Sequence, residues 1–127
     1  MKAFRLPWLW LGLWVALLVA VAYASLGAPR SGPDVPASDK WMHLATYFLV
    51  AAAGVQLFRP GRPLLWAAGF AVFYGVAMEI GQGTLTTDRM MDWRDAVANT
   101  IGVVLGVLTS RTPVRDALLR AVPSGRD

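Results

Sequence analysis

The sequence predicts an all-α fold, an integral membrane four-helix bundle with both termini cytoplasmic. Of the 127 residues, 56% are hydrophobic and only 16% are charged. Four apolar stretches are separated by short connections, and Lys and Arg gather on one set of these connections. Soluble domains carry roughly 25% charged residues, and a chain this short cannot hide so much apolar surface from water. The composition excludes a disordered or fibrous chain and leaves a membrane protein or an apolar subunit of a complex.

A membrane-spanning helix needs about 20 mostly apolar residues, and the four apolar stretches approach this length. We expect a single domain, 1–127, with helices at about residues 7–26, 39–58, 63–82 and 92–110, followed by a cytoplasmic tail at 111–127. Arg alternates with apolar residues in the tail, which suggests a short amphipathic helix at the membrane surface.

The first stretch has a second interpretation. Trp8 to Leu26 carries no charge, while Lys2 and Arg5 precede it and Ala22-Tyr23-Ala24 resembles a signal-peptidase site. A signal peptide has an apolar region of about 7–15 residues, which is shorter than this stretch. A retained helix is therefore favoured over a cleaved signal peptide.

The other three stretches follow clear breaks in the chain. Ser38 and Asp39 are good N-cap residues and follow a segment rich in Pro and Gly. The Arg59–Pro63 turn separates the second stretch from the third, which Glu79 interrupts near its end. A polar loop then leads to the fourth stretch, which is the shortest.

The basic residues predict the orientation, because Lys and Arg concentrate on cytoplasmic loops. One side would hold Lys2, Arg5, Arg59, Arg62, Arg111, Arg115, Arg120 and Arg126. The other side would hold only Arg30, Lys40, Arg89 and Arg94. Both termini are thus expected in the cytoplasm of a bacterial-type cell, with the chain crossing the inner membrane several times.

Polar residues within the spans should converge on the extracytoplasmic end. Three helices would supply Asp39, His43 and Tyr47, then Glu79 and Gln82, then Asp92, Asp95 and Asn99. Residues three or four apart share a helix face, and a charge at the bilayer centre costs at least ~2.5–3.5 kcal/mol. We interpret these residues as a polar pocket that is open to the outside and closed toward the cytoplasm.

Two other interpretations remain open. Polar side chains can simply hydrogen-bond helices together within the membrane. Alternatively, Asp39, Arg89, Asp92 and Arg94 are ordinary loop charges in water.

Gly102 and Gly106 form a small-x-x-x-small face that favours close helix packing. Tryptophans near the span ends are expected to be membrane anchors, namely Trp8, Trp10, Trp41, Trp66 and Trp93.

The order of these polar residues resembles the VanZ-like family of small bacterial polytopic membrane proteins, which is named after a teicoplanin-resistance protein. The matching pattern is Asp39-Lys40-x-x-His43-x-x-x-Tyr47, Glu79-x-x-Gln82 and Arg89-x-x-Asp92-x-x-Asp95-x-x-x-Asn99-x-x-Gly102-x-x-x-Gly106. Asp88 and Leu44 depart from the residues common in that family. The resemblance implies a helical membrane protein of the cell envelope linked to glycopeptide antibiotic response, but it implies no established reaction.

The residue types suggest acid–base or binding chemistry on an envelope lipid, a lipid-linked cell-wall precursor or another phosphate-bearing ligand. An imidazole exchanges protons near neutral pH, so His43, Glu79 and Asp95 are the candidate catalytic residues. Candidate ligand-binding residues are Asp39, Tyr47, Gln82, Arg89, Asp92 and Asn99, with Arg89 able to bind a phosphate bidentately. No cofactor is expected, although carboxylates such as Asp39, Glu79 and Asp92 or Asp95 would suit a divalent cation. One histidine and no cysteine argue against structural zinc.

Whether the protein is an enzyme stays open. The alternative is a non-enzymatic accessory or scaffold protein whose polar cluster is a structural hydrogen-bond network. A transporter is the weakest hypothesis, because the cytoplasmic halves of the spans carry almost no polar residue. The expected partners are the lipid bilayer and an envelope ligand, not nucleic acid, and the short fourth span is compatible with homo-oligomers.

Overall fold

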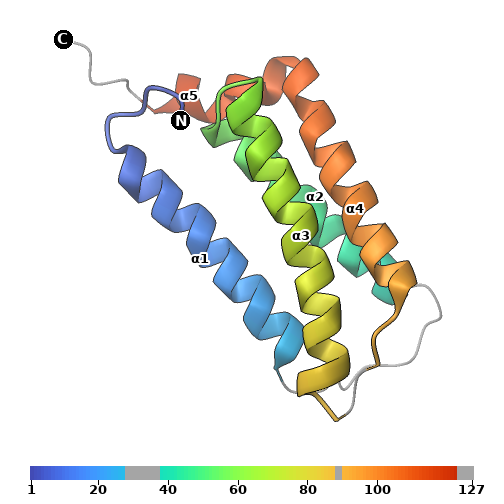
Figure 1. Ribbon diagram of the computed structural model, residues 1–127. Helices are drawn as coiled ribbons and strands as arrows, with labels where there is room; N and C mark the ends of the chain where they lie inside the picture. Colours follow the sequence, from blue (N-terminus) through green and yellow to red (C-terminus); the bar gives the residue numbers. More distant parts are fainter. Residues whose placement is uncertain (28–37, 88–89, 123–127) are drawn as a thin grey trace.

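A computed structural model describes residues 1–27, 38–87 and 90–122 (Figure 1). Within these residues the regular structure is entirely helical, which confirms the all-α class. The elements are α1 (Pro7–Leu26), α2 (Ser38–Leu57), α3 (Arg62–Leu85), α4 (Trp93–Leu108), the 3₁₀ turns η1 (Thr109–Arg111) and η2 (Pro113–Asp116), and α5 (Ala117–Ala121). The helix α3 runs beyond its expected end at residue 82, and α4 gives way to 3₁₀ geometry at Thr109.

Local sequence signals explain where the helices begin. Pro7 is the first residue of α1, a position where the missing N–H costs no helical hydrogen bond. Gly61 precedes α3 with a φ of 93°, which glycine adopts without steric penalty. Asp92 caps α4, because its carboxylate accepts a 2.9 Å hydrogen bond from the backbone N–H of Arg94.

Two helices of the described chain, α1 and α3, are long and apolar enough to cross a membrane. A third span is counted only if Trp93–Arg111 and Pro113–Ala121, which meet at 82°, form one broken span. Large apolar side chains lie exposed along the surface, among them Leu13 and Val19 of α1 and Leu65 and Phe73 of α3. Such a surface is unfavourable in water and indicates association with a membrane.

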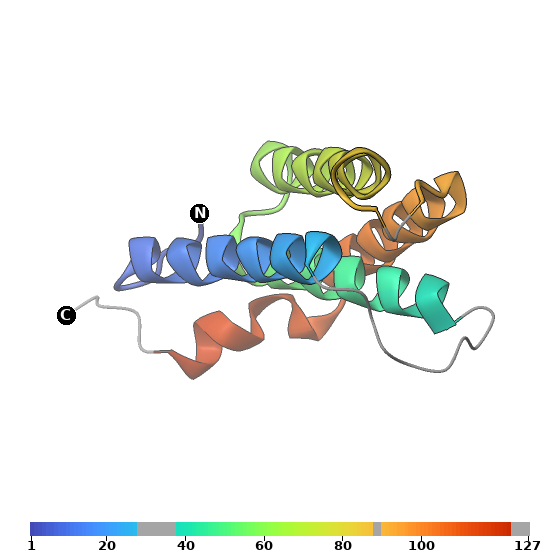
Figure 2. The same ribbon diagram turned by 90° about the horizontal axis from the view of Figure 1, so that it is seen from below.

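The four long helices run roughly side by side (Figures 1 and 2). The helices α2 and α4 make the most extensive contact, α3 packs on both of them, and α1 packs on α2 and α3. At one end, named here the site end, α1 and α3 terminate while α2 and α4 begin. Met1 and the segment from η1 to α5 lie at the opposite end, named the tail end.

Two glycines allow the close contact between α2 and α4. A Cβ added at Gly102 would collide with the backbone carbonyl oxygen of Leu44. A Cβ at Gly106 would lie 2.6 Å from the carbonyl oxygen of Phe48 and from the Cβ of Ala51. These glycines therefore serve the packing role expected of the small-x-x-x-small pattern.

Polar groups of aromatic side chains fasten α1 to its neighbours. The indole of Trp14 is buried and donates a 3.0 Å hydrogen bond to the carbonyl of Val50 in α2. The hydroxyl of Tyr74 in α3 donates a 2.6 Å hydrogen bond to the carbonyl of Leu18. Four of the tryptophans expected as anchors are strongly exposed close to the starts of their helices, namely Trp8, Trp41, Trp66 and Trp93.

Lys2 is buried at the tail end, where the sequence suggested only a cytoplasmic charge. Its ammonium donates to the carbonyl of Val55 at 2.7 Å and to the carbonyl of Arg115, and it pairs with Asp116 at 2.9 Å. The side chain of Gln56 also binds this region, donating to Val114 and accepting from the N–H of Leu118. The tail is therefore fixed to the end of α2 rather than separate from the helices.

We expect Gly102→Ala to destabilise the protein, because the added methyl group forces α2 away from α4. The cost should be about 1–3 kcal/mol, the usual range for overpacking, as measured by thermal unfolding in detergent. Gly69→Ala is the matched control, since a Cβ at Gly69 in α3 meets nothing within 4 Å. Equal stability of the two variants would contradict the close contact.

We also expect Lys2→Met to lower the free energy of unfolding by about 1.5–3 kcal/mol, the range for hydrogen bonds to charged groups. Denaturant unfolding in detergent would measure the loss. Arg5→Met removes a neighbouring but exposed charge and should change stability by less than about 0.5 kcal/mol. A Lys2→Met variant as stable as Arg5→Met would show that the burial of Lys2 contributes nothing.

Candidate functional site

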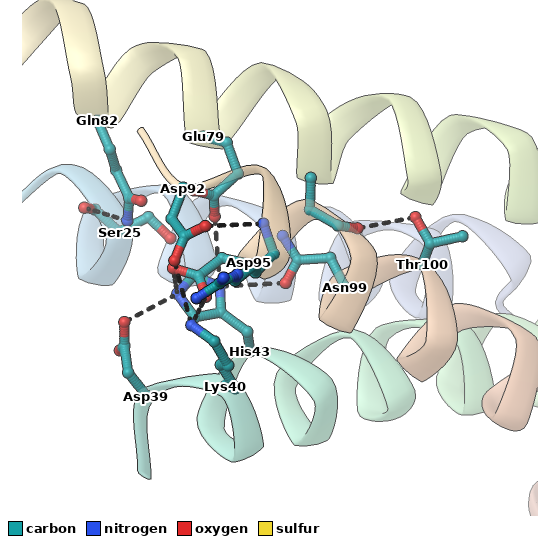
Figure 3. Close-up of polar contacts among 12 residues, drawn as sticks. Ser25, Asp39, Lys40, His43, Glu79, Gln82, Asp92, Asp95, Asn99 and Thr100 are labelled. Carbon is teal, nitrogen blue, oxygen red and sulfur yellow. Dashed lines mark hydrogen bonds and ion pairs between the residues drawn. The ribbon is translucent and has the colours of Figure 1, made fainter. Parts of the chain in front are cut away.

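Polar side chains from three helices meet at the site end (Figure 3). His43 of α2 lies at the centre. Its Nδ1 is 3.4 Å from Oε1 of Glu79 in α3, and its Nε2 is 3.8 Å from Oδ2 of Asp95 in α4. The structure thus brings together the three residues for which the sequence suggested acid–base roles.

Two further residues border the same imidazole ring. The Nδ1 atom of His43 is 3.1 Å from Oδ1 of Asn99. The Nε2 atom is 3.7 Å from Oδ2 of Asp39, one turn earlier in α2. The side chain of His43 is 13% exposed and that of Asp39 is 60% exposed. The ring is therefore mostly enclosed, with Asp39 at the mouth of the cluster.

Lys40 also belongs to the cluster, although it is not among the site residues that the sequence predicts. Its ammonium lies 3.1 Å from Oδ1 of Asp95 and 3.2 Å from Oδ2 of Asp92. The backbone N–H of Arg94 and then this ammonium lower the pKa of Asp92, at the start of α4, below its ordinary value. The sequence offered one signal for this role: Lys40 lies three residues before His43 and therefore near the same helix face. We name Asp39, Lys40, His43, Glu79, Asp92, Asp95 and Asn99 the polar cluster.

Several buried polar atoms have no hydrogen-bond partner among the described residues. They are both carboxyl oxygens of Glu79, the hydroxyl of Tyr47 and the Nδ2 of Asn99. Glu79 and Asn99 are each only 1% exposed. Buried polar groups in proteins are nearly always paired, so each exception requires an explanation such as a bound water, ion or ligand.

Tyr47 and Gln82 lie beside the polar cluster rather than in it. Tyr47 packs between α2 and α3, where a Cβ at Gly75 would lie 3.1 Å from its ring. Gln82 faces α1 and donates a 3.1 Å hydrogen bond to the carbonyl of Ser25. These two residues connect the polar cluster to the end of α1.

A cavity of about 250 Å³ lies between α1, α2 and α3 at this end. Its lining includes apolar residues of α1 and polar groups of the neighbouring helices: Ala20, Val21, Ala24, Ser25, Met42, His43, Thr46, Tyr47 and Gln82. None of these described lining residues is a carboxylate. The acids of the polar cluster lie instead around His43, on the side of α4 and α3.

One expected site residue remains. Arg89, the expected phosphate ligand, lies outside the described residues. Arg94, which the sequence suggested to be an ordinary loop charge, is exposed, and its guanidinium lies 5.8 Å from the ring centre of Trp93.

The polar cluster combines four carboxylic acids with one lysine and one histidine. This composition suits a proton or a metal ion better than an additional anion. Asp39, His43 and Asp95 offer three candidate ligand atoms within 4.8 Å of one another. Both ring nitrogens of His43 face acidic or amide oxygens, so neither is directed freely toward the cavity.

Comparison with known proteins adds no identification. No protein-family model matches the chain, and neither the curated proteins nor the solved structures give a significant match. The resemblance of the polar residues to the VanZ-like family therefore remains a prediction from the sequence.

Proposed function

We propose that this chain is a multi-pass membrane protein that binds the polar end of a lipid-linked, phosphate-bearing ligand of the cell envelope at its site end. The observation that carries the proposal is the cavity between α1, α2 and α3, where apolar and polar surfaces meet. The link to the envelope and to glycopeptide response comes from the VanZ-like resemblance.

The proposed topology has four spans, with both termini in the cytoplasm and the site end outside. Its support comes from the charges, because the tail end carries Arg59, Arg62, Arg111, Arg115 and Arg120. Lys and Arg concentrate on the cytoplasmic side of membrane proteins. In this topology α2 and α4 are spans that cross beside α1 and α3, the two helices long and apolar enough to span a membrane.

The lining of the cavity suits an amphiphile with an anionic head. Ala20, Val21 and Ala24 form an apolar wall on α1, against which a hydrocarbon chain can pack. Tyr47 and Gln82 offer hydroxyl and amide donors on the opposite wall, without a carboxylate that would repel phosphate. Arg89 enters the proposal from the sequence as a further phosphate contact.

Binding is better supported than catalysis on a ligand in the cavity. General acid–base chemistry needs a nitrogen within hydrogen-bond reach of the reacting group. The nitrogens of His43 face Asp39 and Asp95 on one side and Glu79 and Asn99 on the other. We therefore give His43, Glu79 and Asp95 a positioning and charge-balancing role in the proposal.

The alternative, a purely structural network, is favoured by one observation. Lys40 bridges Asp92 and Asp95 and so ties α2 to the start of α4. A structural network, however, normally satisfies all of its members. The unpartnered carboxyl oxygens of Glu79 are the feature that this alternative leaves unexplained.

We expect Ala24→Leu to weaken the binding of a polyisoprenyl phosphate at least about tenfold, because the larger side chain fills the cavity at the apolar wall. Ala16→Leu is the matched control, since Ala16 is exposed two turns earlier in α1 and does not line the cavity. Binding would be followed in mixed micelles by native mass spectrometry or fluorescence titration. Equal affinities for both variants would contradict a ligand in this cavity.

We expect His43→Gln and Glu79→Gln to separate binding from a structural network. If the polar cluster serves a ligand, both variants should lose the lipid phosphate while their thermal unfolding in detergent changes by less than about 1 kcal/mol. Glu79→Gln replaces a buried carboxyl group that has no hydrogen-bond partner among the described residues, so this substitution can even stabilise the fold. A parallel loss of stability and binding would favour the structural alternative.

A further inference from the structure

We propose that Asp39, His43 and Asp95 form a binding site for a divalent transition-metal ion at the mouth of the polar cluster. The inference does not rest on the lipid-linked ligand, because the metal ion can be measured in the absence of any lipid phosphate. It follows from the direction of the histidine nitrogens, the distances among three ligand atoms, and a buried acid without a hydrogen-bond partner.

In the neutral ring, the nearer acceptor favours the tautomer of His43 with its hydrogen on Nδ1. Oδ1 of Asn99 lies 3.1 Å from this nitrogen and Oε1 of Glu79 lies 3.4 Å from it. An amide oxygen accepts hydrogen bonds but cannot donate them, and so does an ionised carboxylate. In the neutral ring, a hydrogen on Nδ1 leaves Nε2 with an unshared electron pair.

That electron pair faces two carboxylate oxygens. Nε2 lies 3.7 Å from Oδ2 of Asp39 and 3.8 Å from Oδ2 of Asp95. Both distances are too long for a hydrogen bond. They do match the separation between two ligands of one metal ion, because zinc–nitrogen and zinc–oxygen bonds are about 2.0–2.2 Å long. One cation between the three atoms would turn a repulsive arrangement into an attractive one.

Neighbouring residues hold the ligands as they do in known metal sites. A metal-bound histidine almost always donates its other N–H to a carboxylate or a carbonyl oxygen, and the amide oxygen of Asn99 occupies that position here. Lys40 binds Oδ1 of Asp95 at 3.1 Å and leaves Oδ2 directed toward His43. Lys40 therefore orients the carboxylate without occupying the proposed ligand atom.

Glu79 supplies the second, independent observation. Its carboxyl group is 1% exposed, lies against His43 and has no hydrogen-bond partner in the described part of the chain. A metal ion on Nε2 would make the ring a stronger donor at Nδ1 and would balance this buried acid. Among the described residues, the polar cluster combines four carboxyl groups with one lysine, a composition that suits a further cation.

The ligand set favours Zn²⁺ or Mn²⁺ over Mg²⁺ or Ca²⁺. Imidazole suits the transition metals, whereas magnesium and calcium prefer sites made only of oxygen. Three protein ligands leave coordination positions for water or an anion. Because the side chain of Asp39 is 60% exposed, the ion can enter from the aqueous side of the site end.

The test uses the full chain, freed of any purification tag and of bound metal, in detergent. Titration with Zn²⁺ and Mn²⁺ should reveal one ion per chain, with Mg²⁺ binding at least about tenfold more weakly. His43 is the only histidine, so ¹⁵N-labelled histidine gives one pair of ring signals. We expect Zn²⁺ to shift the Nε2 signal strongly while Nδ1 keeps its hydrogen. An unshifted Nε2 signal at saturating Zn²⁺ would overturn the proposal.

Two matched variants separate ligation from charge. Asp39→Asn should weaken Zn²⁺ binding at least about tenfold, whereas Asp92→Asn removes the same charge nearby and should weaken it less than about threefold. Asn at residue 92 can still cap α4, and thermal unfolding would verify that both variants fold. Equal weakening by both would mean diffuse attraction rather than a built site, and would contradict the proposal. Failure of lipid binding alone would leave the metal site intact.

Discussion

The close approach of α2 and α4 is the constraint on which the site depends. Gly102 and Gly106 present only hydrogen toward the backbone of α2, so the two helices approach closely at these positions. This spacing brings His43 within 3.1 Å of Asn99 and Lys40 within 3.1 Å of Asp95. Hydrogen bonds weaken steeply over a few tenths of an ångström, so a wider spacing would separate the polar cluster into isolated buried charges.

The polar cluster has two parts with different energetics. The contacts of Lys40 with Asp92 and Asp95 lie near the surface, where ion pairs contribute little to stability. The part around Glu79 is deeply buried, and there the uncompensated acid is costly. Stability of the fold alone does not favour a carboxyl group at the buried position of Glu79. The contacts of Lys40 therefore serve mainly to join the start of α4 to α2, whereas the burial of Glu79 has to be explained by something other than stability.

The positions of the helices were largely predictable, because runs of apolar residues and the Pro and Gly residues that interrupt helices act on the neighbouring chain. The expected bounds of the first helix, 7–26, match α1. Asp39 and His43 are four residues apart in α2, and this spacing alone predicts that they share a helix face. The role of Lys40 could not be deduced in this way, since it depends on how near α4 approaches. Gln82 likewise binds α1 rather than His43, because its face is decided by the packing of α1 on α3. The position of Lys2 was missed because a lysine near the first residue usually marks topology and is rarely buried.

The burial of Lys2 also constrains the order of assembly. Its partners at the tail end include Asp116 and the carbonyl of Arg115, a full 113 residues later in the chain. These contacts can form only after residues 115 and 116 have been synthesised. The last of the four long helices precedes these residues in the chain, so the site end can assemble before the tail end is joined to Lys2.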